Sequence, residues 1–245
     1  MTLYAYYSEN RKEPLDLHII TGLKQIELIY LKRGYHRYIK ARLKALGYEY
    51  DETYVKKIML MTYAYHDIGK ATEKLQEMIM NGKGAPYHEV LSAIILKNQF
   101  DEQYITPLEK GCVIAVLLHM GALRDPIKSI NKAISQGIIY TRLKGDTITW
   151  FNKTLKKIYP EIADIFLIKQ SRDMTFNKKS VYELISFLGE YFYIKRGTEQ
   201  RIVPIQLSTY LLLHPLITAD ELAVCKNTNK KPRKWIDEFI GAFKS

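Results

Sequence analysis

The chain has 245 residues, of which 47% are hydrophobic and 26% charged, a composition that allows a sizeable core and argues against wholesale disorder. Lys and Arg number 37 against 26 Asp and Glu, so the formal net charge of +11 favours a polyanionic partner, either nucleic acid or an anionic membrane surface. Cys112 and Cys225 are the only cysteines, which excludes a disulfide scaffold and a cysteine-based zinc module.

No targeting or membrane segment is expected. Met1 is followed by polar, tyrosine-rich sequence rather than by a basic and then an apolar run, so we expect no secretory signal. The most apolar stretch, residues 112–118, is far shorter than the roughly 20 residues that a membrane helix needs. We therefore expect a soluble, cytoplasmic protein without a membrane-spanning segment, and the candidate metal ligands described below favour nucleic acid rather than a membrane surface as its partner.

Helical periodicity dominates the chain from its N-terminal part onward. Over residues 15–46, apolar side chains recur every three or four positions between Lys and Arg residues, with Pro14 near the start and Gly47 beyond the end. This pattern predicts one amphipathic helix. A second helix is predicted over residues 52–80, ending at the glycine-containing loop 81–84.

The remaining chain is also predicted to be helical. The expected helices cover residues 88–96, 111–120, 126–137, 147–168, 180–194 and 234–243. A further apolar segment, 205–223, contains Pro215, which should break or kink it. Convincing alternating strands are absent, although residues 137–141 or 147–150 have the composition of a small hairpin. With no internal repeat or linker, we predict one all-α domain over residues 1–245, with a helical bundle core at about 15–225 and a basic segment at 226–245.

The residues that could carry chemistry are histidines and carboxylates. His66 and Asp67 are adjacent within an apolar stretch, where burial of an unpaired carboxylate is unfavourable unless a cation compensates its charge. Imidazole and carboxylate together are suitable ligands for a divalent metal. The alternative interpretation is an ion pair from Asp67 to Lys70 with His66 packed in the core, and this stretch by itself is equally compatible with both.

Other candidate ligands lie at predicted helix ends or kinks, where side chains from several helices can meet inside a bundle. They are His18, His88, His119 and Asp220. We interpret His36, which lies among Tyr and Arg residues, as a solvated helix-face residue, and His214 as a packing or capping residue before Pro215.

The ordered set of His18, His66-Asp67 and Asp220 resembles the signature of the HD-domain superfamily of metal-dependent phosphohydrolases, an all-α fold. Three neighbouring motifs resemble the CRISPR-associated HD nucleases of type I systems, in their stand-alone form. They are His66-Asp67-Ile68-Gly69-Lys70, Tyr87-His88-Glu89 followed by three residues and Ala93, and His119-Met120-Gly121. The resemblance covers nearly the whole chain.

The resemblance also implies roles for these residues. His18, His66, Asp67 and Asp220 would hold one metal ion, and Asp67 would bridge to a second ion held by His88 and His119. Asp67 and Lys70 would be catalytic, with Lys70 near the scissile phosphate; the alternative role for Lys70 is to pair with a surface acid.

The expected metal is a transition metal. Histidine-rich ligand sets favour Mn, Ni, Co or Fe over Mg. The family often has a His-His-Gly tripeptide, whereas here the second position is Met120, and a thioether is a poor ligand for hard divalent ions. The second site is therefore expected to be weaker or completed by water, unless the enzyme uses one metal.

We expect a metal-dependent nuclease that hydrolyses phosphodiester bonds of DNA, single-stranded DNA above all, or of RNA, in CRISPR interference and antiviral defence. The resemblance implies a separate helicase and the RNA-guided interference complex as partners, and since the chain has no Walker-type phosphate loop, any ATP-driven unwinding must come from another chain. The basic segment, with Lys230, Lys231 and Arg233, is expected to bind phosphates together with Lys70, although such charge runs are commonly solvated surface.

Two alternatives stay open at this stage. One is a nucleotide phosphohydrolase or phosphodiesterase of the same superfamily, against which the high positive charge argues. The other is a non-catalytic helical subunit that binds nucleic acid.

Overall fold

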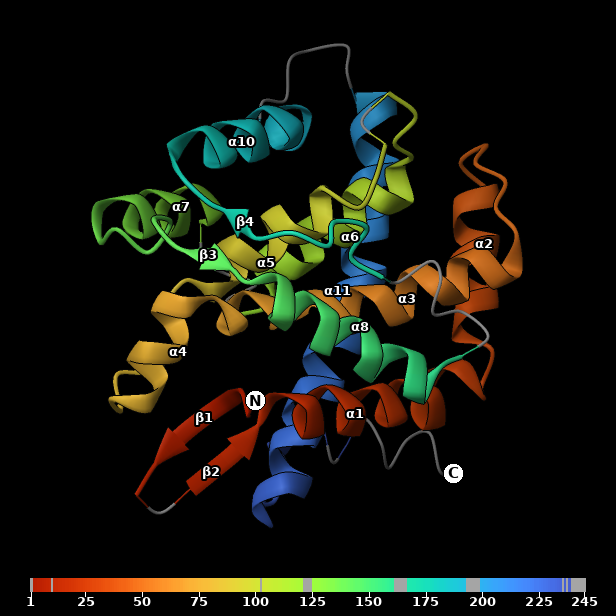
Figure 1. Cartoon of the computed structure of the whole chain (residues 1–245). Coiled ribbons are helices and arrows are strands. Elements are labelled where there is room, and N and C mark those ends of the chain that lie inside the picture. The colour runs from red at the N-terminus through yellow and green to blue at the C-terminus, as the bar shows by residue number, and fades with distance from the viewer. Residues whose placement is uncertain are drawn as a thin grey trace.

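A computed structural model of the chain describes residues 2–9, 11–101, 103–120, 125–160, 167–192, 199–234, 236 and 238. Within these ranges the protein is a bundle of helices with two small two-stranded antiparallel sheets (Figure 1), which confirms the predicted all-α fold. The helix predicted over residues 234–243 lies mostly outside the described residues.

The N-terminal part begins with a hairpin that the sequence pattern did not reveal. Strands β1 (Tyr4–Ser8) and β2 (Arg11–Pro14) are antiparallel and lead directly into α1 (Leu15–Gln25). The single helix predicted over residues 15–46 is wrong, because a π-helical segment, η1 (Ile26–Leu31), and a turn separate α1 from α2 (Tyr35–Lys44). At this turn Gly34 has a φ of +76°, a left-handed conformation that glycine adopts without a steric penalty.

The helix predicted over residues 52–80 is also divided, and the division creates the site described below. α3 (Glu52–His66) is followed at Asp67 by a short 3-10 helix, η2 (Ile68–Ala71), and then by α4 (Glu73–Met80). η2 packs closely against the first turn of α5 (His88–Lys97), where the Gly69 amide donates a hydrogen bond to Ser92 Oγ at 2.8 Å. A Cβ atom on Gly69 would lie 2.3 Å from the carbonyl oxygen of His88, so only glycine permits this approach.

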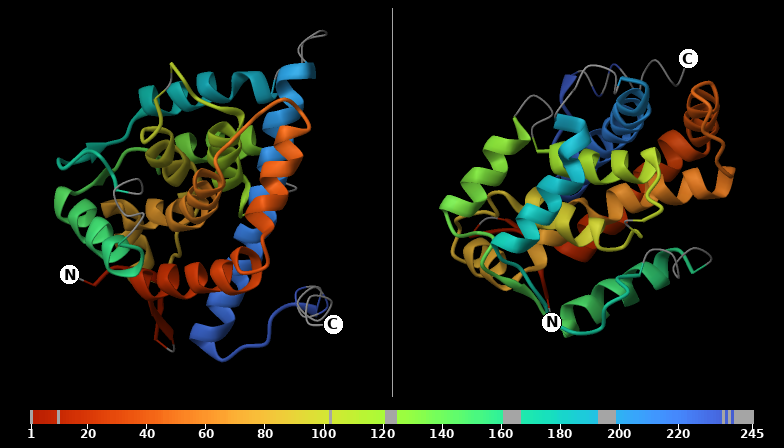
Figure 2. Two further views of the ribbon diagram at one scale, coloured as in Figure 1. Left: turned by 90° about the vertical axis from the view of Figure 1, so that its right-hand side faces the viewer. Right: turned by 90° about the horizontal axis from the view of Figure 1, so that it is seen from above.

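The buried helix α6 (Pro107–Leu118) lies in the middle of the bundle. It starts with a capping box of Thr106 and Glu109 and is almost entirely apolar. It packs against α11 (Glu199–Thr228), which also contacts α1 and α3 and runs along one side of the bundle (Figure 2).

The predicted break at Pro215 does not occur, since α11 continues through it. Proline has no amide hydrogen to donate to the carbonyl four residues earlier, which is that of Leu211. In the structure this carbonyl accepts a hydrogen bond from the Tyr35 hydroxyl at 3.2 Å. A side chain of α2 therefore replaces the missing backbone donor, and the helix stays intact.

The peripheral elements complete the fold. α7 (Pro126–Ser135), α8 (Gly145–Ile158) and α10 (Lys178–Phe192) surround the central helices, and β3 (Arg142–Leu143) pairs with β4 (Met174–Thr175). The predicted hairpin positions were wrong, because residues 147–150 lie in α8 and residues 137–140 form the turn and bend that precede β3. Among the described helices, even the 30-residue α11 has no stretch apolar enough to cross a bilayer.

Candidate metal centre

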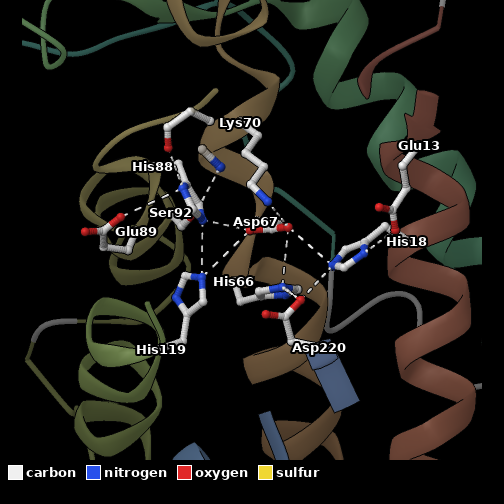
Figure 3. Close-up of polar contacts among 12 residues, drawn as sticks. Glu13, His18, His66, Asp67, Lys70, His88, Glu89, Ser92, His119 and Asp220 are labelled. Atoms are coloured by element: carbon white, nitrogen blue, oxygen red, sulfur yellow. Dashed lines mark hydrogen bonds and ion pairs between the residues drawn. The ribbon is translucent and has the colours of Figure 1, made fainter. Parts of the chain in front are cut away.

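Six side chains from helices α1, α3, α5, α6 and α11, or from the residues directly after them, converge at the centre of the bundle (Figure 3). The helix breaks and ends at His66-Asp67, His88 and His119 direct these side chains inward instead of along a continuous helix surface. Their possible ligand atoms form two groups, and within each group all of these atoms lie within 4.8 Å of one another. The groups are His18, His66, Asp67 and Asp220, and Asp67, His88 and His119.

The carboxylate of Asp67 is shared by the two groups. Its Oδ2 lies 3.3 Å from Nε2 of His18 and 3.5 Å from Nε2 of His66. Its Oδ1 lies 2.8 Å from Nε2 of His88 and 3.8 Å from Nε2 of His119. Asp67 therefore presents one oxygen to each group, as a carboxylate that bridges two cations does.

In each of the four histidines, Nδ1 points away from the cluster and faces an oxygen that can accept a hydrogen bond. Nδ1 of His66, of His88 and of His119 lies 2.6, 2.7 and 2.6 Å, respectively, from the backbone carbonyl oxygen three residues earlier. Nδ1 of His18 lies 2.9 Å from the carboxylate of Glu13. Because carbonyl and ionised carboxylate oxygens only accept hydrogen bonds, each Nδ1 carries a hydrogen, and in the neutral ring Nε2 presents a lone pair to the centre.

The inner nitrogens lack partners that would satisfy them. Nε2 of His18 and Nε2 of His66 lie 3.0 and 3.5 Å from Oδ1 of Asp220, but in the neutral ring they carry no hydrogen to donate to it and stay unsatisfied. Nε2 of His88 and Nε2 of His119 lie 3.2 Å apart, where two lone pairs repel each other unless a proton or a metal cation lies between them. Imidazole nitrogens with carboxylate oxygens are a donor set for divalent transition metals. The buried cluster thus fits a metal ion.

Both acids of the cluster, the buried Asp67 and the partly exposed Asp220, stay ionised. Burial by itself would raise the pKa of Asp67, but His66, Lys70 and His88 outweigh it and hold that pKa well below its ordinary value. Burial likewise opposes ionisation of Asp220, and His18 and His66 hold its pKa well below the ordinary range. The centre therefore keeps two negative charges that attract a cation.

The histidines respond to the same charges in opposite ways. Burial disfavours a charged ring at His18, but the carboxylates of Asp220, Glu13 and Asp67 raise its pKa to about 9. Burial dominates at His66 and lowers its pKa, whereas Asp67 raises the pKa of His119 against the effect of burial. In the metal-free protein, protons supply part of the positive charge that a metal would replace.

Lys70 forms an ion pair with the carboxylate shared by the two groups. Its Nζ is 2.6 Å from Oδ2 of Asp67, and although burial disfavours the charged ammonium, Asp67 and Asp220 raise its pKa. The Asp67–Lys70 ion pair of the alternative interpretation is thus present. Asp67 is buried, however, so it is not a surface acid, and His66 belongs to the same cluster of possible ligands. Solvent reaches the centre at Asp220 and Lys70, whose side chains are 30% and 16% exposed, while none of the four histidine side chains exceeds 2%.

The predicted phosphate-binding segment folds back along α11. Lys230 and Lys231 are exposed directly after the helix. Nε of Arg233 lies 3.3 Å from Oε2 of Glu221, the residue next to Asp220. Arg233 is therefore paired with α11, the helix that carries Asp220, which the linear sequence did not require.

Three other residues complete the comparison with the sequence. Met120 is 48% exposed. His36 is buried rather than solvated. Its Nε2, on α2, lies 3.0 Å from the carboxylate of Glu52, on α3. His214 packs against Tyr30, whose hydroxyl is 3.2 Å from its Nδ1, outside the cluster.

Glu13 is the main residue that sequence reasoning missed. It is buried on β2 and touches the candidate ligand His18. The only local signal was an acidic residue before Pro14 at a helix start, a pattern too common to indicate a site. Its importance depends on the hairpin, which was not predicted.

No protein-family model and no curated protein matches the sequence. Among solved structures, the chain is similar to the CRISPR-associated Cas3 HD domain protein MJ0384 from Methanocaldococcus jannaschii. The TM-score is 0.50 at 21% sequence identity, over 83% of this chain and 95% of that chain. The chain therefore shares its fold with that Cas3 HD domain protein, and it has a buried His/Asp cluster at its core.

Proposed function

We propose that the chain is a metal-dependent nuclease, one HD domain over residues 1–245, that hydrolyses phosphodiester bonds of DNA, or of RNA. The observation that carries the proposal is the shared Asp67 carboxylate, with four histidines that each direct Nε2 toward it. The net charge of +11 supports a polyanionic substrate. The likeness to a CRISPR-associated Cas3 HD domain protein supports a CRISPR context. Our proposal places the chain in CRISPR interference in the cytoplasm, beside a separate helicase and an RNA-guided complex.

In this proposal the two groups hold two divalent ions, with Asp67 common to both. Mn, Ni, Co or Fe suits the nitrogen-rich donor set better than Mg. Bound ions would supply activation of water and neutralisation of phosphate charge. The second group has three protein donors, since the exposed Met120 adds none suited to a hard ion, so we expect it to be the weaker site.

The residues around the centre would then handle the substrate. The phosphate would approach from the side where Asp220 and Lys70 are exposed to solvent. The ammonium of Lys70 would hold a phosphate oxygen there and stabilise the charge that develops during cleavage. Arg233, together with Lys230 and Lys231, would bind the phosphates of the flanking strand.

The test is cleavage by the purified full chain with Mn²⁺, Ni²⁺, Co²⁺, Fe²⁺ or Mg²⁺, together with measurement of bound metal. The substrates are single-stranded DNA, double-stranded DNA, RNA and a mononucleotide. We expect single-stranded DNA to be cut with a transition metal, and Asp67→Asn to lose both bound metal and cleavage. Asp146→Asn, at an exposed position of α8, is the matched control and should behave as the wild type.

Other outcomes would replace the proposal. Faster hydrolysis of the mononucleotide than of any oligonucleotide would indicate a nucleotide phosphohydrolase. Binding of DNA without cleavage under any metal would indicate a non-catalytic subunit. Full activity with Mg²⁺ and none with Mn²⁺ or Ni²⁺ would contradict the histidine ligand set.

A further inference from the structure

One candidate ligand is held differently from the others. Among the four histidines of the cluster, His66, His88 and His119 direct Nδ1 to backbone carbonyl oxygens. His18 instead directs Nδ1 to a charged side chain, the carboxylate of Glu13, at 2.9 Å. A carboxylate makes the ring a stronger donor at Nε2 than a neutral carbonyl does, because it stabilises positive charge on the imidazole.

Glu13 is itself fixed by contacts from both ends of the chain. Its Oε1 also accepts a hydrogen bond from Nδ2 of Asn227 at 2.9 Å, and its Oε2 pairs with the guanidinium of Arg11. Asn227 is oriented in turn by the Thr21 hydroxyl, which donates to its Oδ1 at 3.1 Å. The side chain of Glu13 is only 3% exposed, so it has little freedom to leave His18.

The elements involved connect the two termini to one metal group. Glu13 lies on β2, directly before α1, which carries His18. Asn227 lies on α11 seven residues after Asp220, about two helical turns along the same face. α11 thus supplies both a ligand, Asp220, and the amide that orients the acid behind another ligand.

We propose that Glu13, oriented by Asn227, is a positioning residue that holds His18 as a ligand of the first metal group. This inference rests on the proposed function, since it requires the cluster to bind metal. Without the carboxylate, His18 would keep its place on α1, but its tautomer and ring orientation would no longer be set. Substitution of residues behind a metal ligand generally weakens metal affinity by roughly 10–100-fold.

The competing explanation is that Glu13 only anchors the hairpin through Arg11. Glu13→Gln separates the two roles, because it keeps the size and a hydrogen-bonding side chain but removes the charge behind His18. Glu52→Gln is the matched control: Glu52 also contacts a histidine, His36, at 3.0 Å, but that histidine is outside the cluster.

The experiment titrates metal-free full chain with Mn²⁺ in the presence of a competing chelator and records the visible spectrum with Co²⁺, without any nucleic acid. We expect Glu13→Gln to bind Mn²⁺ roughly 10-fold or more weakly and to change the Co²⁺ spectrum, with Glu52→Gln unchanged. Wild-type affinity and an unchanged spectrum in Glu13→Gln would overturn the inference. If the wild type bound neither ion, the proposed function would fail and the inference with it.

A folding defect would not leave the matter open. Circular dichroism identifies a Glu13→Gln variant that does not fold, and Asn227→Ala then carries the test. That change keeps the carboxylate but removes the amide that orients it, so we expect a smaller loss of Mn²⁺ affinity, of about 3-fold. An unaltered affinity in Asn227→Ala would then reject the role of this network.

Discussion

The ammonium of Lys70 lies 2.6 Å from Oδ2 of Asp67, the same oxygen that faces Nε2 of His18 and Nε2 of His66. Lys70 therefore neutralises part of the charge that a metal would neutralise in the first group. The ammonium and a metal at this oxygen would repel each other, so the lysine would weaken metal binding while it keeps a cation at the solvent-exposed side of the centre.

This relationship gives a test that separates the roles of Lys70. Lys70→Met removes the charge but keeps a long apolar side chain, so we expect tighter Mn²⁺ binding together with cleavage that is slower by about 100-fold. Chelator competition and single-turnover cleavage measure the two effects. Weaker Mn²⁺ binding with an unchanged cleavage rate would mean that Lys70 only supports the cluster.

The pKa of His18 predicts how pH affects the metal-free protein. That pKa is about 9 in the folded chain against an ordinary value of 6.5. Because the folded value is the higher one, the protonated ring stabilises the fold fully below pH 6.5, and this contribution is lost as the pH rises toward 9. The melting temperature of the metal-free protein should fall over that interval.

Metal binding should depend on pH in the opposite direction. A metal must displace the proton of His18, so Mn²⁺ affinity should rise between pH 6.5 and 8.5, by up to about tenfold per pH unit for one displaced proton. Chelator competition at three pH values measures this dependence. An affinity that is constant over the range would show that His18 is not a ligand.

Gly69 determines how closely Asp67 approaches α5. In Gly69→Ala the new Cβ would lie 2.3 Å from the His88 carbonyl oxygen and 2.9 Å from the Ser92 amide nitrogen. We expect a loss of about 1–3 kcal/mol in the free energy of unfolding, and weaker metal binding because Asp67 moves relative to His88. Denaturant unfolding and metal titration measure the two effects.

The control for this change is Gly189→Ala on α10, where a Cβ meets no atom within 4 Å. Alanine is the better helix former, so Gly189→Ala should stabilise the protein by about 0.5–1 kcal/mol. Equal behaviour of the two variants would contradict the close packing of η2 on α5.

Rising salt concentration should weaken binding of nucleic acid but leave metal affinity nearly unchanged. Affinity for single-stranded DNA should fall with rising salt, and the combined change of Lys230, Lys231 and Arg233 to Ala should reduce the slope of log affinity against log salt by up to about 2. The combined change of the exposed Lys178 and Lys179 to Ala on α10 is the control and should leave the slope unchanged. Mn²⁺ affinity should vary little, because the histidines proposed as its ligands are buried.

The sequence by itself determined the helical class of the fold and the six candidate ligands. Apolar periodicity reports helix propensity and burial locally, and the donor chemistry of His66, Asp67 and their counterparts is a property of residue type and order. For this reason the predicted set coincides with the two groups that the structure brings together.

Only the tertiary structure decided where the helices end and what stands behind the ligands. The apolar periodicity of the sequence continues across Gly34 and Asp67. In the structure the chain turns at Gly34, and the helix α3 ends just before Asp67. The continuity of α11 at Pro215 depends on Tyr35, 176 residues from the carbonyl that it satisfies, and Glu13 meets Asn227 across 214 residues. Such hydrogen bonds form between segments that only the fold brings together, so no local pattern in the sequence could have indicated them.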